Sequence, residues 1–325
     1  MNARASSELR GLSLIAQSDT RAPSALSNAG TRKAPVPATT GEDEAMLRPA
    51  TPADRADIIS LALAEDAAWS GGPAVSAEEA GEFTDSYGRG VIFERDGRVA
   101  GYAAVGEGSE TIVLVDPGND PAPALEALAA WLGERGHHQI DSYARDARRI
   151  AWLEAHGFTY RRSSFDLERG IDQPLAPAVW PSGVAVARYR PGEDAESVHT
   201  LIYVDAAWAE VPGHTQESLE AWRSMLTPEY RGWVARREGR PVGWVVGRVF
   251  TDGRGWIQQL AVARSARGLG LGRALLLHAL AELCSRGATS LALGVQAENE
   301  NAVGLYRDIG FEVTREWRVY ARPTA

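Results

Sequence analysis

A glycine-rich loop before an apolar helix is the stretch of this sequence whose residue types could do chemistry. Residues 263–280 read ARSARGLGLGRALLLHAL, with three glycines at alternate positions between two arginines. A glycine lowers helix stability by about 1 kcal/mol relative to alanine, so three of them in five residues need a reason. Residues 255–263 are apolar enough for a strand, and residues 272–287 place leucines on one face of a helix. The loop therefore joins a strand to a helix N-terminus.

That junction is suited to hold an anion. Amides at a helix N-terminus lack partners within the helix, and the helix dipole favours negative charge there. Glycines let a phosphate approach the backbone closely, and Arg267 and Arg273 add charge-assisted contacts. A dinucleotide-binding G-x-G-x-x-G motif is excluded because Arg273 or Leu275 stands where glycine or alanine is needed, and a P-loop because the loop has no lysine. The loop predicts a pyrophosphate site; the alternative is a flexible turn without a ligand.

The chain also repeats itself. Three pairs of similar segments occur in the same order about 140 to 150 residues apart: DAAW at 66–69 and 205–208, ERDGRVAGYAAV at 94–105 and RREGRPVGWVVG at 236–247, and LEAHGFTYRR at 153–162 and YRDIGFEVTR at 306–315. Such colinear matches indicate a duplicated unit. We expect domains at 46–169 and 183–325, joined by a proline-containing linker at 170–182.

Each repeat shows the same order of expected elements. A strand and two helices precede a hairpin that turns at DGR or EGR; a strand, a long helix, a strand, a short helix and a final strand follow. This order predicts the α/β class, with two tandem domains that each have a mixed, mostly antiparallel central sheet flanked by helices. Residues 1–45, rich in Ala, Ser, Thr and Pro, predict a disordered tail, and Met46 is an alternative start.

Composition and charge exclude several classes. Cys284 is the only cysteine and the six histidines lack ligand spacing, so we expect no metal. Without an apolar run of roughly 18 residues we expect no membrane contact and a cytoplasmic location. Residues 46–180 hold 22 acidic and 12 basic residues (net −10), whereas 181–325 hold 16 and 17 (net +1). No basic stripe indicates nucleic acid, and the second part can accept an anion.

Two motifs in the second repeat resemble those of the GNAT superfamily of N-acetyltransferases. ARGLGLGRALL at 266–276 fits the pattern R/Q-x-x-G-x-G/A. AENENAVGLYRDIGF at 297–311 fits N-x-x-A-x-x-x-Tyr-x-x-x-Gly-Phe. The resemblance covers about 185–320, and it implies that acetyl-CoA is the co-substrate.

The resemblance also implies a role for each matching position. The strand residues Leu260, Ala261 and Val262 would bind the pantetheine through their backbone, Asn299 would reach the pantetheine arm, and Tyr306 would be the general acid for the departing thiolate. The loop amides would hold the pyrophosphate: Arg267, Gly268, Leu269, Gly270, Leu271, Gly272 and Arg273.

The general base is the part of the site that the sequence leaves open. Members of the family often carry a glutamate on the strand before the glycine loop, where this chain has Gln258 and Gln259. An amide cannot take a proton, so Gln259 is expected to orient the acceptor or a water by hydrogen bonding. Glu210 and His214 are candidates for a base, because the resemblance places their segment over the acceptor cleft; the alternative is that both are solvated.

The first repeat lacks these devices. DPGNDPAPA at 116–124 stands where the second repeat has RSARGLGLG, and its prolines remove donors while its acids repel a pyrophosphate. At the tyrosine position the first repeat has Trp152. We therefore expect a degenerate domain that supports the fold, covers the cleft or binds the acceptor.

These observations predict an N-acetyltransferase that moves an acetyl group from acetyl-CoA to a primary amine of a small molecule. The layout resembles two-domain members of the family such as mycothiol synthases. Within the enzyme class, a protein N-terminus is another acceptor to consider. The rival class is a non-catalytic acyl-CoA-binding sensor or interaction module, and a homodimer stays an open alternative.

Overall fold

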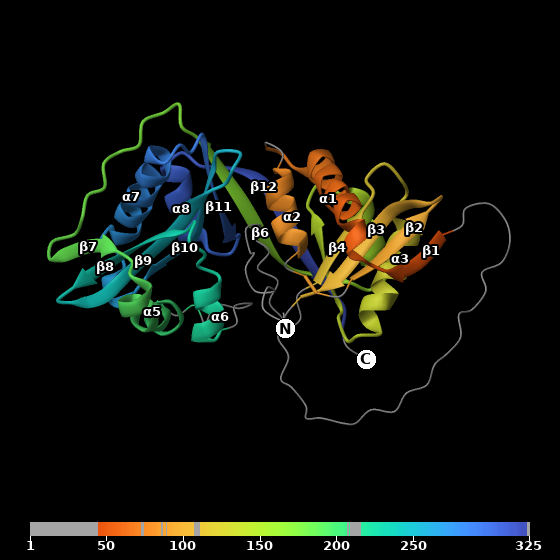
Figure 1. Cartoon of the computed structure of the whole chain (residues 1–325), viewed down its shortest axis with the longest axis horizontal. Helices are drawn as coiled ribbons and strands as arrows, with labels where there is room; N and C mark the ends of the chain where they lie inside the picture. Colours follow the sequence, from red (N-terminus) through yellow and green to blue (C-terminus); the bar gives the residue numbers. More distant parts are fainter. Residues whose placement is uncertain are drawn as a thin grey trace, which may run out of the picture.

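The computed structural model describes residues 45–72, 75–85, 87–88, 90–106, 111–206, 208 and 216–323. Within them the chain forms two α/β lobes, with β6 and β12 running between them (Figure 1). One sheet has the order β1-β2-β3-β4, and the other has the order β5-β12-β6-β11-β10-β9-β8-β7. Among the paired strands of these residues, only β10 and β11 are parallel. The predicted fold class is confirmed.

The elements of the two halves follow the same order. The first half contains β1 (Ala45–Pro49), η1 (Pro52–Asp54), α1 (Arg55–Trp69), α2 (Ala77–Asp85), β2 (Gly90–Arg95), β3 (Arg98–Val105), β4 (Thr111–Val115), α3 (Ala122–Gly133), β5 (Gln139–Tyr143), α4 (Ala147–Ala155) and β6 (Thr159–Gly170). The second half contains β7 (Val184–Arg188), α5 (Pro191–Thr200), the π-helical turn η2 (Leu201–Asp205), α6 (Leu219–Ser224), β8 (Arg231–Arg237), β9 (Arg240–Val249), β10 (Arg254–Val262), η4 (Arg264–Ala266), α7 (Leu271–Ser285), β11 (Ser290–Gln296), α8 (Glu300–Asp308) and β12 (Glu312–Ala321).

The last strand of each half pairs with the other half. β6 lies between β11 and β12, and it pairs antiparallel with β11 from Ser290↔Gly170 to Gln296↔Ser164. β12 in turn pairs antiparallel with β5. The last strand of each half thus lies beside a strand of the other half: β6 beside β11, and β12 beside β5. One eight-stranded sheet therefore contains strands of both halves. The domain limits at 46–169 and 183–325 stay a prediction, but the halves share strands across them.

Helix α7 covers one face of the second half. Its apolar positions include Leu275, Leu276, Leu280 and Leu283, all fully buried. A Cβ on Gly243 of β9 would lie 2.6 Å from Leu275 Cδ1, so glycine is required for the helix to pack this closely. This packing holds the start of α7 beside the end of β10.

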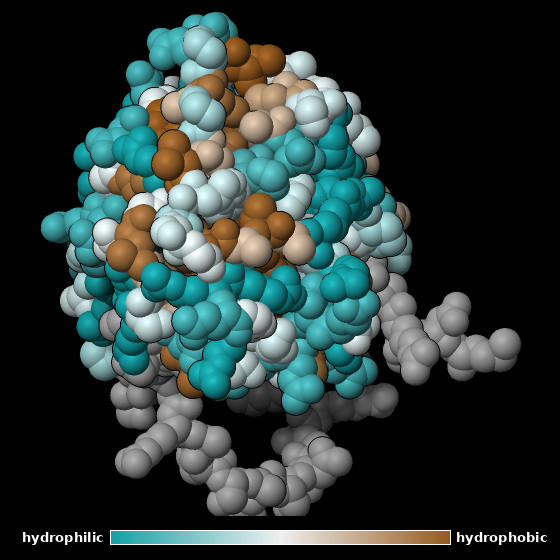
Figure 2. All heavy atoms as spheres, turned by 90° about the vertical axis from the view of Figure 1, so that its left-hand side faces the viewer, coloured by the Kyte–Doolittle hydropathy of each residue, from teal (hydrophilic) through white to brown (hydrophobic). Residues whose placement is uncertain are grey.

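The segment between β6 and β7 packs on the second half. The Trp180 ring lies 5.6 Å from that of His278 on α7, and Leu175 and Ala178 are partly buried in the same core. Figure 2 shows the side of the molecule on which this half lies, where apolar side chains form small patches among hydrophilic ones. The face drawn there offers no single large apolar area.

Candidate active site

A gap opens where β10 leaves β11. The two strands pair in parallel only from Arg254↔Ser290 to Ile257↔Leu293. Beyond that point β11 continues to pair with β6, whereas residues 259–262 of β10 pair only with β9 among the described strands. Backbone groups of β10 on the β11 side are therefore available to a ligand. Leu260, Ala261 and Val262, the residues predicted to bind pantetheine, lie on this stretch.

An irregularity in β10 marks the start of the gap. The register to β9 shifts between Ile257 and Gln259, so that Gln258 is an extra residue in the strand. Bulges of this kind turn side chains to new directions and are frequent beside active sites. Gln258 and Gln259, which the sequence analysis considered as site residues, therefore lie where β10 and β11 separate.

The glycine loop has the geometry of an anion-binding site. Gly268 has φ +74° and Gly270, the N-cap of α7, has φ +80°, conformations that favour glycine. Ala274 is the first residue of α7 whose amide donates a hydrogen bond to a backbone carbonyl, that of Gly270, at 3.1 Å. Within the described residues, the amides of 268–273 donate to no protein group. They are available to an anion, and the pyrophosphate site at this loop stays a prediction.

The two loop arginines differ in their surroundings. The Arg267 guanidinium donates to Ala206 O at 2.6 Å and to Val262 O at 3.4 Å, so it fastens the loop to the end of η2 and of β10. Arg273 pairs with Asp308 at 3.0 Å, and the two side chains are 43% and 69% exposed. An ion pair this exposed is weak and can give way to a phosphate. Of the two arginines predicted to contact the phosphate, Arg273 is therefore more readily available than Arg267.

Helix α8 carries the two other predicted residues. Asn299 is the N-cap, and its Oδ1 accepts a hydrogen bond from the Ala302 amide at 3.3 Å. Tyr306 is 7% exposed and packs edge-on against Phe311, with 6.3 Å between ring centres. Burial raises the pKa of Tyr306 to about 12, so the phenol keeps its proton at neutral pH. Its hydroxyl has no hydrogen-bond partner among the described residues.

Aromatic donors hold both glutamines. Gln259 Oε1 accepts hydrogen bonds from the indole nitrogens of Trp222 and Trp244, each at 3.1 Å. Gln258 Oε1 accepts one from Trp256 Nε1 at 2.9 Å and one from the Tyr230 hydroxyl at 3.4 Å. The sequence does not reveal these contacts, because Trp222 and Gln259 are 37 residues apart. The other predicted groups, Glu210 and His214, lie outside the described residues.

The first half fills the equivalent gap with its own side chains. Arg149 of α4, which is 1% exposed, donates to Val113 O on β4 and to Asp141 O on β5, both at 3.3 Å. Its guanidinium also pairs with Glu65 of α1. Glu65 Oε1 in turn accepts from the Val115 amide at 2.7 Å. A side-chain ion pair therefore occupies the backbone groups between β4 and β5.

The aligned helices of the two halves correct one assignment. α4 and α8 are nine residues long, and each ends two residues before a glycine with positive φ, Gly157 and Gly310. Matching these glycines sets Leu153, which is fully buried, opposite Tyr306. Trp152 is therefore not the equivalent residue. The loss of the tyrosine and the filled gap both support the prediction that the first half is degenerate.

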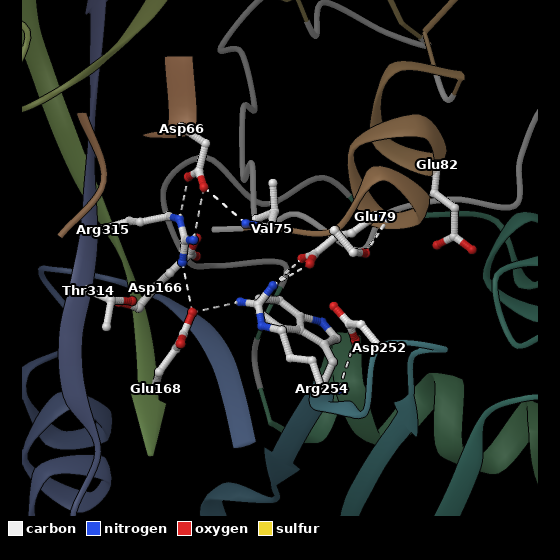
Figure 3. A network of polar contacts seen from close by, with 12 residues as sticks. Asp66, Val75, Glu79, Glu82, Asp166, Glu168, Asp252, Arg254, Thr314 and Arg315 are labelled. Carbon is white, nitrogen blue, oxygen red and sulfur yellow. Dashed lines mark hydrogen bonds and ion pairs between the residues drawn. The ribbon is translucent and has the colours of Figure 1, made fainter. Parts of the chain in front are cut away.

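A buried charge network joins the first half to β10 (Figure 3). Arg315 of β12 donates to Asp66 of α1 at 2.6 Å and to Glu168 of β6 at 2.8 Å. Arg254, the first residue of β10, pairs with Glu79 of α2 and lies 3.3 Å from Glu168. The first half thus fixes the beginning of the strand that lines the gap. No group of three or more side chains in the described part of the chain is arranged to hold a metal ion.

Known proteins are similar to this chain in both sequence and architecture. The acetyltransferase (GNAT) family model matches residues 195–311. A mycothiol acetyltransferase of Thermomonospora curvata is 30% identical over 272 residues, which cover 77% of this chain and 88% of that protein. One of Streptomyces griseus is 29% identical over 299 residues, covering 86% and 95%. A GCN5-related N-acetyltransferase from Sphaerobacter thermophilus matches with a TM-score of 0.72 at 25% identity, covering 86% of this chain and 97% of that one. A tandem GNAT protein from the clavulanic acid biosynthesis pathway shares the fold, with a TM-score of 0.66 at 19% identity and coverage of 87% and 100%.

The chain belongs to the GNAT acetyltransferase family, and it has the family's tandem arrangement. It is an acetyl-CoA-dependent acyltransferase, which confirms the resemblance, the enzyme class and the co-substrate inferred from the motifs. Among the helices that the structure describes, none is long and apolar enough to span a membrane. The cytoplasmic location and the oligomeric state stay predictions.

Proposed function

We propose that this protein transfers the acetyl group of acetyl-CoA to a primary amine of a small molecule by direct attack. The observation that carries the proposal is the gap between β10 and β11 together with the partner-free amides of 268–273 beside it. The gap offers backbone groups of residues 260–262 to pantetheine, and the loop offers donors to the pyrophosphate. This arrangement brings the thioester to the bulge at Gln258.

Tyr306 is the proposed general acid. A thiolate leaving group needs a proton, and the raised pKa of the buried phenol keeps that proton available through the neutral range. Neither Gln258 nor Gln259 can remove a proton from the acceptor. The amine must therefore arrive neutral, or Glu210 or His214 must deprotonate it.

The names of two relatives support an acceptor of the kind used by mycothiol acetyltransferases. A non-catalytic acyl-CoA sensor is the second candidate, and the absence of a carboxylate at Gln258 and Gln259 is the observation that favours it. The two candidates differ in turnover and not in binding.

Both candidate functions, the acetyltransferase and the acyl-CoA sensor, require acetyl-CoA binding, which calorimetric titration tests. We expect one site per chain, because Arg149 and Glu65 occupy the gap of the first half. Two sites would contradict this assignment, and no binding at millimolar ligand would contradict the proposed function.

A Tyr306→Phe variant tests catalysis with a panel of primary amines and thiol release as the readout. We expect unchanged acetyl-CoA affinity and a turnover lower by about 10²- to 10⁴-fold, the range for loss of a general acid. Equal loss of binding and turnover would show that the hydroxyl serves acetyl-CoA binding and not the chemical step. No turnover by the unaltered protein with any amine would favour the sensor.

A further inference from the structure

The side-chain amide of Gln259 has a single orientation. Its Oε1 accepts hydrogen bonds from both Trp222 Nε1 and Trp244 Nε1 at 3.1 Å. An indole nitrogen only donates, so the atom that two indoles contact must be the oxygen. A flip of the amide would set its NH2 group against two further donors and leave both indoles without an acceptor. Because both tryptophans are fully buried, no water can compensate for that loss.

The fixed oxygen determines where the donor is. Gln259 Nε2 has no hydrogen-bond partner among the described residues, although the residue is only 7% exposed. Gln259 also directly precedes Leu260, where the stretch of β10 that faces the gap begins. A strand rises about 3.3 Å per residue, so the amide lies within a side chain's reach of a molecule bound at the gap.

We propose that Gln259 donates a hydrogen bond from Nε2 to the acceptor molecule, and that Trp222 and Trp244 are positioning residues for it. The inference rests on the proposed function. It predicts an acceptor that carries a carbonyl or hydroxyl oxygen close to its reacting amine. A simple alkylamine leaves the Nε2 group unpaired in the complex, and a site built to donate a hydrogen bond discriminates against such a ligand.

Gln258 offers a comparison within the same bulge. Its oxygen is held by Trp256 and Tyr230, and the side chain is more exposed than that of Gln259. Trp256 makes no hydrogen bond to Gln259. A Trp256→Phe variant therefore removes one indole donor at the bulge without releasing the amide of Gln259, which makes it a matched control.

Conjugates of CoA test the proposal without knowledge of the natural acceptor. In each conjugate the CoA sulfur is joined through an acetyl group to the nitrogen of glycinamide, ethanolamine or propylamine. The three have similar length and no free amine, so amine basicity does not enter the comparison. Calorimetry on the full chain gives the ratio of the propylamine dissociation constant to that of each oxygen-bearing conjugate.

We expect at least one oxygen-bearing conjugate to bind about tenfold more tightly than the propylamine conjugate. In a Gln259→Glu variant the carboxylate still accepts from both indoles, so the fold is retained while the donor is lost, and the ratio falls to about one. The Trp222→Phe/Trp244→Phe double variant lowers the ratio as well, because the amide can then flip. Trp256→Phe keeps the ratio of the unaltered protein.

Three results would overturn the proposal: a ratio near one in the unaltered protein, a ratio that survives Gln259→Glu, or an equal fall in Trp256→Phe. Acetyl-CoA itself is titrated with every variant. If it binds normally while the ratio is one, only this inference fails. If it does not bind the unaltered protein at all, the proposed function fails instead. Should the double tryptophan variant not fold, the Gln259→Glu result decides alone.

Discussion

Replacing Gly272 by alanine separates the structural and functional reasons for the loop glycines. Gly272 is the second residue of α7, and a Cβ built on it lies 3.6 Å from Val262 Cγ2 and 3.8 Å from Leu305 Cδ2. These are ordinary van der Waals distances, so alanine fits the free protein without strain. Alanine is favoured over glycine in a helix by about 1 kcal/mol. We expect Gly272→Ala to raise the free energy of unfolding by about 0.5 to 1 kcal/mol.

The same substitution should weaken acetyl-CoA binding. The added methyl group would stand between Val262 of β10 and Leu305 of α8, at the edge of the predicted pantetheine site. It would keep a phosphate away from the amides of residues 268–273, which have no other partner in the described structure. Loss of one charge-assisted hydrogen bond is worth about 1.5 to 3 kcal/mol. At 1.4 kcal/mol per tenfold, the dissociation constant should rise about 10- to 100-fold.

Urea unfolding and calorimetry on the same preparation measure the two effects. Gly192→Ala is the control, because Gly192 is the second residue of α5 and a Cβ there meets nothing within 4 Å. The control should be stabilised to a similar degree and should bind acetyl-CoA normally. A Gly272→Ala protein that is more stable and binds acetyl-CoA as tightly as the unaltered protein would refute the reasoning. The glycine would then serve some purpose other than close approach of the cofactor.

Three further predictions concern other parts of the molecule. Burial raises the pKa of Asp166 from 3.8 to about 6, so its contribution to stability is present below pH 3.8 and lost as the pH rises through 6. Asp166→Asn should therefore increase the free energy of unfolding at pH 8 by up to about 3 kcal/mol. A lower free energy of unfolding for this variant, measured with urea, would contradict the prediction. Arg149→Met leaves Glu65 buried without its partner and should lower the free energy of unfolding by about 3 to 5 kcal/mol. In thermal unfolding, the double variant Arg149→Met/Glu65→Gln should lose less stability than Arg149→Met. Asn299→Asp keeps an oxygen for the cap of α8 but loses the amide donor, so calorimetry should show weaker acetyl-CoA binding at unchanged stability, and unchanged binding would remove Asn299 from the cofactor site.

The strand, loop and helix around the glycines could be predicted because their signals are local. The segment expected to be a strand at 255–263 is β10 at Arg254–Val262, and the helix expected at 272–287 is α7 at Leu271–Ser285. Apolar periodicity and glycine each act over a few residues, and both appear directly in the sequence. Glycine also permits the positive φ of Gly268 and Gly270, although residue type alone does not show which glycines adopt it.

Contacts between distant residues could not be predicted in this way. Glu65 and Arg149 are 84 residues apart, and each alone reads as a helix-surface charge. Asp66 of the repeated DAAW segment was visible only as a marker of duplication, yet its carboxylate accepts from Arg315 across 249 residues. The exchange of β6 and β12 is also hidden. Both strands follow a short helix and a Gly-Phe turn, and neither pattern states which half supplies the neighbouring strand.

That exchange gives the first half a structural role although its own gap is filled. The proposed acetyl-CoA gap exists because β10 and β11 diverge after Ile257, so its shape depends on how firmly each strand is held. β11 is held along its outer edge by β6 of the first half, from Ser290 to Gln296. The start of β10 is held by the pair between Arg254 and Glu79 of α2. Both walls of the gap are therefore anchored by residues of the half that carries no cofactor loop. The first half can thus lack the cofactor motifs and still hold the strands of the proposed site in place.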